Sequence, residues 1–166
     1  MILVAWIVVA LGTVLSALYT ASEIAIVAVN RLRLRHFVRI GVPQAKRSEQ
    51  VAARPDAYLT TGLIGLNLAN SITAVAATSL VVHMDWPKGP GAKTALFICA
   101  SLLFVLVAEL IPKALVRLRP TFFLLYLSGL LVYSERIFRP AILLVEKLMR
   151  KVFGEVGYAG RVTRGE

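Results

Sequence analysis

The stretch KTALFICASLLFVLVAELIPKALV, residues 93–116, is apolar along most of its length, yet it contains the carboxylate of Glu109. At about 1.5 Å per residue, a helix of this length exceeds the roughly 30 Å hydrocarbon core of a bilayer. An ionisable side chain is costly at that depth, so it is typical of an ion, proton or substrate site. The stretch therefore predicts a membrane protein with a polar site in its interior.

The composition supports this class. Hydrophobic residues make up 58% of the 166 residues, and the mean hydropathy is +0.75. Two further runs, residues 2–29 and 57–82, have membrane length. We therefore expect an all-α integral membrane protein with three transmembrane helices per protomer, in the cell membrane. His36 and His83 fall in the predicted connecting segments. No serine–histidine pair is therefore expected within a span, and the sequence does not indicate an enzyme.

The net charge of +10 is unevenly distributed. Seven of the nineteen Lys and Arg residues lie within residues 31–54, and ten lie from Lys113 onward. By the positive-inside rule, the loop 31–56 and the C-terminus are expected in the cytoplasm and the N-terminus outside. Nucleic acid is not an expected partner, because no aromatic interleaving or known binding module accompanies these charges. The bilayer is the expected environment.

The segments outside the three runs have their own predictions. Residues 121–134, TFFLLYLSGLLVYS, are apolar but only 14 long, so we interpret them as interfacial or re-entrant. Residues 140–153 are predicted to form an amphipathic helix that starts at Pro140. The loop 31–56 is interpreted as a solvated linker that touches lipid. The transmembrane domain then covers residues 1–154, and residues 155–166 form a tail.

Each run carries polar residues toward its cytoplasmic half. Glu109 lies roughly 12 Å from the inner end, Glu23 roughly 9 Å, and Asn67 with Asn70 roughly 15–20 Å. In the first run Ser16, Thr20 and Glu23 follow i, i+4, i+7 spacing, and Ser22 lies on the neighbouring flank; in the second, Asn67, Asn70 and Ser71 share a face. These side chains are therefore able to converge at one depth.

Pro112 adds a possible backbone ligand. It has no N–H to donate to the carbonyl of Ala108, which is left free one residue from the carboxylate of Glu109. Carboxylate, amide, hydroxyl and carbonyl oxygens suit a hard cation. Two simpler interpretations stay open: the Asn and Ser residues bond across helices only, and Glu109 pairs with Lys113 four residues later.

Five motifs resemble one known family in order and spacing. They are TASEIA at 20–25, NRLRLRH at 30–36, RPD at 54–56, GLNLANS at 65–71 and ELIPK at 109–113. Together they are similar to the transmembrane domain of the CorC/CNNM magnesium transporters. The resemblance implies a homodimer of three-span protomers, a Mg²⁺ site in each, and Mg²⁺ export coupled to Na⁺ entry. It also implies a cytosolic CBS-pair domain in the full-length chain.

The motifs map onto particular residues of this chain. The resemblance implies metal ligands at Ser22, Glu23, Asn67, Asn70, Ser71 and Glu109. Ser16, from its helix spacing, and the Ala108 carbonyl, from the missing N–H of Pro112, are further candidates. Ala21 stands where the family often has Gly, and Leu66 where it often has a second consecutive Asn. The second departure removes one possible oxygen ligand. A different class of function also fits the sequence, namely a membrane sensor or scaffold with a structural cation site and no transport of its own.

Overall fold

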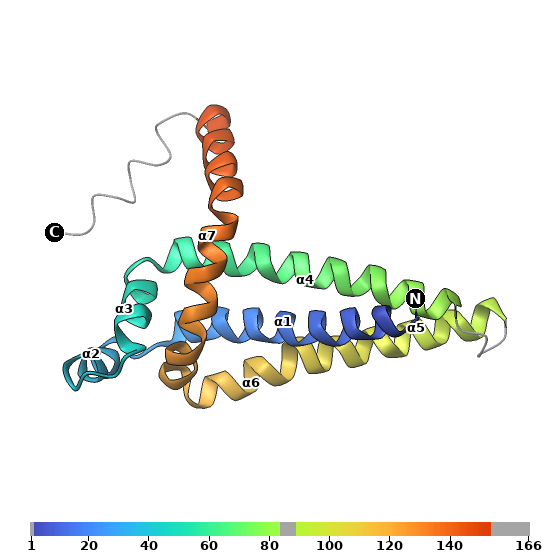
Figure 1. Ribbon diagram of the computed structural model, residues 1–166, viewed down its shortest axis with the longest axis horizontal. Coiled ribbons are helices and arrows are strands. Elements are labelled where there is room, and N and C mark those ends of the chain that lie inside the picture. The colour runs from blue at the N-terminus through green and yellow to red at the C-terminus, as the bar shows by residue number, and fades with distance from the viewer. Residues whose placement is uncertain (1, 84–88, 154–166) are drawn as a thin grey trace.

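The computed structural model describes residues 2–83 and 89–153, and every element in this part of the chain is a helix. Three long rods lie lengthwise beside one another (Figure 1). They are α1 (Ile2–Ala28), α4 (Pro55–His83), and a third rod made of α5 (Pro90–Val105), the π-helix η1 (Leu106–Leu110) and α6 (Ile111–Leu118). The three apolar runs predicted from the sequence are thus continuous helical rods.

The first rod is central to the packing. Helix α1 contacts α4 along much of its length, and it also contacts η1 and α6 of the third rod. Helix α4 meets the third rod through α5 instead. The half of the third rod that carries Glu109 therefore packs on α1.

Helix α7 (Pro120–Phe153) corrects the prediction of two separate segments. It is one continuous 34-residue helix with Pro140 inside it, where the sequence predicted an interfacial segment at 121–134 and a new helix from residue 140. Its first part, Pro120–Pro140, is long and apolar enough to cross a membrane, so by length and composition the described chain has four candidate spans. Pro140 removes one backbone hydrogen bond inside α7, but it does not end the helix.

Helix α7 nevertheless differs from the three rods in direction and burial. It runs across the rods (Figure 1) and contacts α1, α3 and α4. In its most apolar window 39% of the residues are buried inside the protomer, against 11%, 22% and 6% for the other three candidates. A larger share of this segment is thus covered by protein than in the other three candidate spans.

The basic loop is folded, which corrects its interpretation as a solvated linker. It forms α2 (Arg31–Arg39) and α3 (Ala45–Ala53), and Gly41, with φ of 79°, makes the turn between them. Leu34 and Val51 have 2% and 0% exposure because they pack into the main apolar cluster with residues of α1 and α7. The apolar residues of this arginine-rich segment thus contribute to the main apolar cluster.

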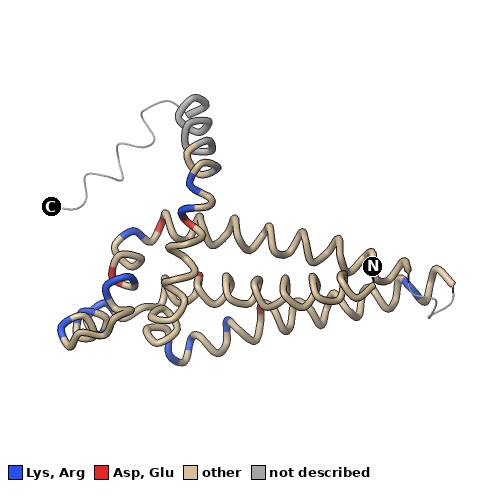
Figure 2. Tube along the Cα trace, viewed as in Figure 1, with Lys and Arg blue, Asp and Glu red and all other residues tan. Residues whose placement is uncertain are grey.

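One end of the bundle, formed by α2, α3, α6 and the start of α7, holds both the apolar cluster and most of the charge. Figure 2 shows Lys and Arg gathered at this end. The Ser48 hydroxyl of α3 donates to the carbonyl of Leu124 in α7 at 3.2 Å and so ties two of its elements together. We call it the basic end. The predicted tail, residues 155–166, lies outside the described residues.

Candidate functional site

Glu109 lies in a turn that is wider than an α-helix. It belongs to η1, and the N–H of Ile111 bonds to the carbonyl of Leu106, five residues earlier. Pro112 follows directly and cannot donate to the carbonyl of Ala108, so the regular α register cannot continue through this point. Single π turns inside α-helices occur frequently at functional sites. The sequence predicted a disturbed helix here but not the π turn.

The Glu109 side chain is half-buried, whereas Ala108 beside it is fully buried. Since η1 packs on α1, the Ala108 backbone is enclosed between these helices. Lys113 is also half-buried. Its role as a charge partner of Glu109 stays a prediction.

The half of α1 that leads into α2 contains a group of buried hydroxyls. Ser16, Thr20 and Ser22 are all fully buried. The Ser22 hydroxyl donates to the carbonyl of Leu18 at 2.7 Å, which is a bond within its own helix. Thr20 Oγ1 is the buried side-chain polar atom for which the described part of the chain supplies no hydrogen-bond partner.

Thr20 was not among the predicted ligands, although the sequence carried a signal for it. It follows Ser16 by four residues and so lies on the same face of α1. A buried hydroxyl without a partner costs about 1–3 kcal/mol. A buried hydroxyl without a partner needs a structural or functional explanation. One explanation is that Thr20 Oγ1 binds a cation.

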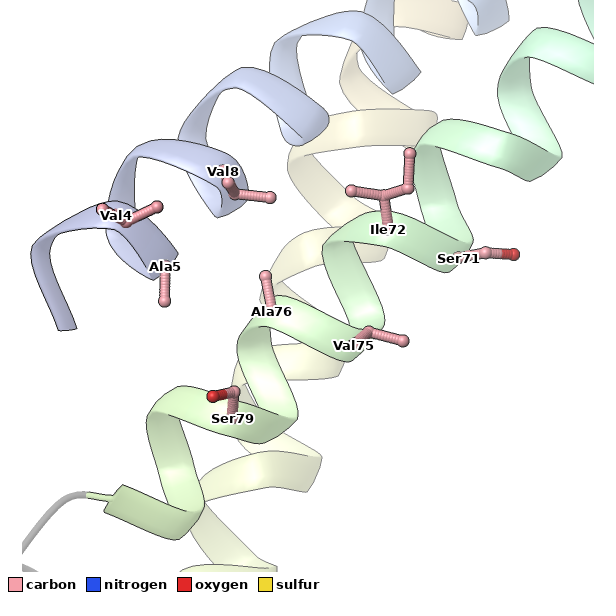
Figure 3. Close-up of a pocket in the computed structure, with 8 residues that line it drawn as sticks. All are labelled: Val4, Ala5, Val8, Ser71, Ile72, Val75, Ala76 and Ser79. Atoms are coloured by element: carbon pink, nitrogen blue, oxygen red, sulfur yellow. The ribbon is translucent and has the colours of Figure 1, made fainter. Parts of the chain in front are cut away.

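The predicted face of α4 is divided between the interior and the exterior. Asn70 is half-buried, and its Oδ1 accepts a 2.6 Å hydrogen bond from Ser16. Asn67 is exposed and donates through Nδ2 to the carbonyl of Leu63 at 2.9 Å. Ser71 is exposed as well and points away from α1 in Figure 3. Of the predicted ligands, the structure thus joins Ser16 to Asn70, and it directs Asn67 and Ser71 outward.

The remaining candidate, Glu23, is half-buried near the basic end of α1. No group of three or more His, Cys, Asp or Glu side chains that could hold a metal ion occurs among the described residues. A cation inside this protomer would therefore be held by one or two carboxylates together with neutral oxygens. That ligand chemistry fits a hard cation better than zinc or copper.

A tyrosine connects this region to α7. Tyr19 is buried, and its hydroxyl lies 2.7 Å from Ser134 Oγ. Its ring rests directly on Gly65 of α4, so closely that a Cβ at residue 65 would collide with the ring. Tyr19 thus contacts both neighbouring elements within one turn of Ser16 and Thr20.

A sizeable apolar pocket lies elsewhere, on the other half of the bundle. It is a groove of about 610 Å³ between α1 and α4, drawn in Figure 3. Six of the eight lining residues are apolar, and the other two are Ser71 and Ser79. Because its lining contains no charged group, this groove does not form the cation site.

Comparison with known proteins adds an independent line of evidence. The family model of the cyclin M transmembrane N-terminal domain matches residues 6–165. The UPF0053 inner membrane protein YfjD of Escherichia coli is 29% identical over 143 residues, which cover 86% of this chain and 33% of that protein. A UPF0053 protein of Haemophilus influenzae is 28% identical over 144 residues, with 87% and 34% covered. A protein of the same organism named polyamine export protein is 25% identical over 138 residues, with 76% and 32% covered.

Proposed function

This chain belongs to the family of the cyclin M transmembrane N-terminal domain and is a multi-pass protein of the cell membrane, and from this membership we propose that it transports Mg²⁺. The chain spans about a third of the length of the curated relatives it matches. Export of Mg²⁺ driven by Na⁺ entry is therefore a proposal about a longer protein. Control by a cytosolic CBS-pair domain is a proposal of the same kind.

The observation that carries the proposal is the position of Glu109 in a π turn that packs on α1, a helix that contains three fully buried hydroxyls. Glu109 supplies the negative charge, and Thr20 Oγ1 is a buried oxygen free to bind. Asn70 already bonds to Ser16 and would exchange that hydrogen bond for the ion. The carbonyl of Ala108 lies beside the carboxylate in sequence and is a further candidate ligand.

Mg²⁺ requires oxygens at about 2.0–2.1 Å in near-octahedral geometry and loses its waters reluctantly. Neutral oxygens in fixed positions replace those waters, and a single carboxylate holds the ion without trapping it. A site of this kind opens to one side when α1 and the third rod separate slightly. Mg²⁺ binding then shifts the equilibrium between the access states of the transporter. The size of the shift is set by the difference in Mg²⁺ affinity between these states. The expected homodimer would provide the outward-facing Asn67 and Ser71 with a second surface.

Titration calorimetry of the purified chain with Mg²⁺ tests the site. Glu109→Gln keeps the shape and removes the charge, so we expect Mg²⁺ binding to be lost while the helical content is unchanged. Glu49→Gln, on the exposed side of α3, removes one charge outside the rods and is the matched control. Wild-type affinity in Glu109→Gln would refute the assignment and make Glu23 the next candidate. Liposome flux then separates a transporter from a sensor or scaffold, which binds Mg²⁺ without moving it.

A second candidate function follows from the relative named polyamine export protein. A polyamine carries amines spaced along a flexible chain, so it needs two separated carboxylates where Mg²⁺ needs a compact shell. Glu23 and Glu109 are two such carboxylates, on α1 and on the third rod. If polyamines are the substrate, Glu23→Gln should reduce flux of spermidine as strongly as Glu109→Gln does. If Mg²⁺ is the substrate, Glu109→Gln should have the larger effect on Mg²⁺ flux.

A further inference from the structure

Helix α2 has two faces of different chemistry. Its inward face is made by Leu34, which is buried, and by Phe37 and Val38, which are half-buried against the apolar cluster. The opposite face follows i, i+3, i+4, i+7 spacing and is exposed throughout. It consists of Leu32, Arg35, His36 and Arg39. Leu32 is 78% exposed, so a large apolar side chain stands among cations and is left mostly uncovered by the described part of the chain.

The position of α2 is fixed relative to a membrane span. It starts at Arg31, three residues after the last residue of α1, and a chain of that length reaches at most about 10 Å. Asn30 accepts a 3.0 Å hydrogen bond from the N–H of Arg33 and so caps the helix. The N–H of Asn30 donates to Thr121 Oγ1 of α7 at 3.4 Å. Helix α2 is therefore held directly beside the end of α1, which is a candidate membrane span.

Helix α3 provides a contrast within the same segment. Its exposed residues are Lys46, Arg47, Glu49, Gln50 and Ala53, with no large apolar side chain among them. The exposed face of α3 is therefore suited to contact with water rather than with lipid. Residues 31–54 as a whole contain seven basic residues and a single acidic one, Glu49, so most of the positive charge on α2 lacks an acidic neighbour in the segment.

From these observations we infer that the outward face of α2 is a binding surface for anionic phospholipids. Arg35 and Arg39 bind headgroup phosphates, for which the planar guanidinium offers paired donors. Leu32 inserts at the level of the first acyl carbons. A basic helix with an apolar residue on the same face is the pattern of interfacial membrane binding, and polybasic segments beside a span attract anionic lipid. A soluble anion would satisfy the arginines but leave Leu32 in water.

The depth of α2 is the first test. A nitroxide is attached through His36→Cys on the Cys99→Ala background, in nanodiscs that contain phosphatidylglycerol and phosphatidylcholine. A second label at Gln50→Cys on α3 serves as the control. We expect the label on α2 to collide more with oxygen than with a water-soluble nickel chelate, and the label on α3 to show the reverse. A label on α2 as accessible to the nickel chelate as that on α3 would overturn the proposal.

Lipid selectivity is the second test. The rise in thermal midpoint between phosphatidylcholine nanodiscs and phosphatidylglycerol-containing nanodiscs is compared among three chains. We expect Arg35→Gln/Arg39→Gln to lose at least half of the wild-type rise, and the charge-matched Lys46→Gln/Arg47→Gln to keep it. Equal losses in the two variants would mean that charge alone is sensed. Absence of any rise in the wild type, or an equal rise from inorganic phosphate in phosphatidylcholine nanodiscs, would also contradict a phospholipid surface on α2.

Discussion

The hydroxyl of Tyr19 lies 2.7 Å from Ser134 Oγ, so a buried hydrogen bond joins α1 to α7 across 115 residues of sequence. The same tyrosine ring rests on Gly65 of α4. Three elements that are distant in sequence therefore meet at one side chain, next to the buried hydroxyls of α1.

Tyr19→Phe removes this hydrogen bond while it keeps the ring on Gly65. We expect a loss of about 1 kcal/mol in stability, because the Ser134 hydroxyl is left buried without its partner. The measurement is the thermal midpoint of the detergent-solubilised chain. Tyr133→Phe is the control, since Tyr133 is next to Ser134 on α7 and its side chain is 66% exposed. Equal midpoints for the two variants would show that the bond contributes nothing.

The two buried glycines of α4 allow a matched comparison. A Cβ at residue 65 would collide with the ring of Tyr19, whereas a Cβ at residue 62 meets no atom within 4 Å. We expect Gly65→Ala to lower the thermal midpoint, because the ring must leave its rotamer or α4 must move away from α1. Gly62→Ala should be neutral or stabilising by up to about 1 kcal/mol, since alanine favours the helix. Equal destabilisation by both would contradict the close approach at Gly65.

The sequence was sufficient to predict the three rods, since each is a long apolar run that ends at basic residues or a turn. It also predicted a disturbance at Pro112. The same hydropathy argument failed for α7 because it assumed that Pro140 begins a helix, and Pro140 lies inside one. It failed for residues 31–54 because arginines dominated the composition, although Leu34 and Val51 hold two helices against the core.

For the site, spacing placed Ser16, Asn70 and Glu109 on suitable faces, and the structure brings Ser16 to Asn70. Spacing alone did not reveal the π turn, which depends on how η1 packs on α1. Nor did it reveal that Thr20 lacks a partner, because a missing hydrogen bond depends on every neighbouring element. Spacing also predicted that Asn67 and Ser71 converge with the other polar side chains, whereas both are exposed in the structure.

The direction of α7 leads to a topology prediction. Because α7 runs across the rods, we expect Pro120–Pro140 to stay on one side of the membrane despite its length. Single cysteines at Arg54, Arg119 and Arg139 on the Cys99→Ala background should then be labelled by an impermeant maleimide from the cytoplasmic side. A cysteine at Ala92 should be labelled from outside. Labelling of residue 139 from the side opposite to residue 119 would instead establish a fourth crossing.

The π turn beside Glu109 leads to the last prediction. Pro112→Ala restores an N–H that can bond to the carbonyl of Ala108, so the wide turn is expected to revert to regular α-helix. If that carbonyl binds Mg²⁺, the change removes one ligand and rotates the carboxylate of Glu109 relative to α1. We therefore expect the fold to be stabilised in the absence of Mg²⁺, and the Mg²⁺-dependent rise in thermal midpoint to shrink.

The matched control is Pro120→Ala, at the first position of α7, where a helix has no use for the N–H. It should leave the Mg²⁺-dependent rise unchanged. Stabilisation without Mg²⁺ combined with a reduced response to it would mean that the irregular turn is retained for binding, at the expense of stability. An undiminished Mg²⁺ response in Pro112→Ala would remove the Ala108 carbonyl from the candidate ligands. The carboxylate of Glu109 and the hydroxyls of α1 would then have to hold the ion with water.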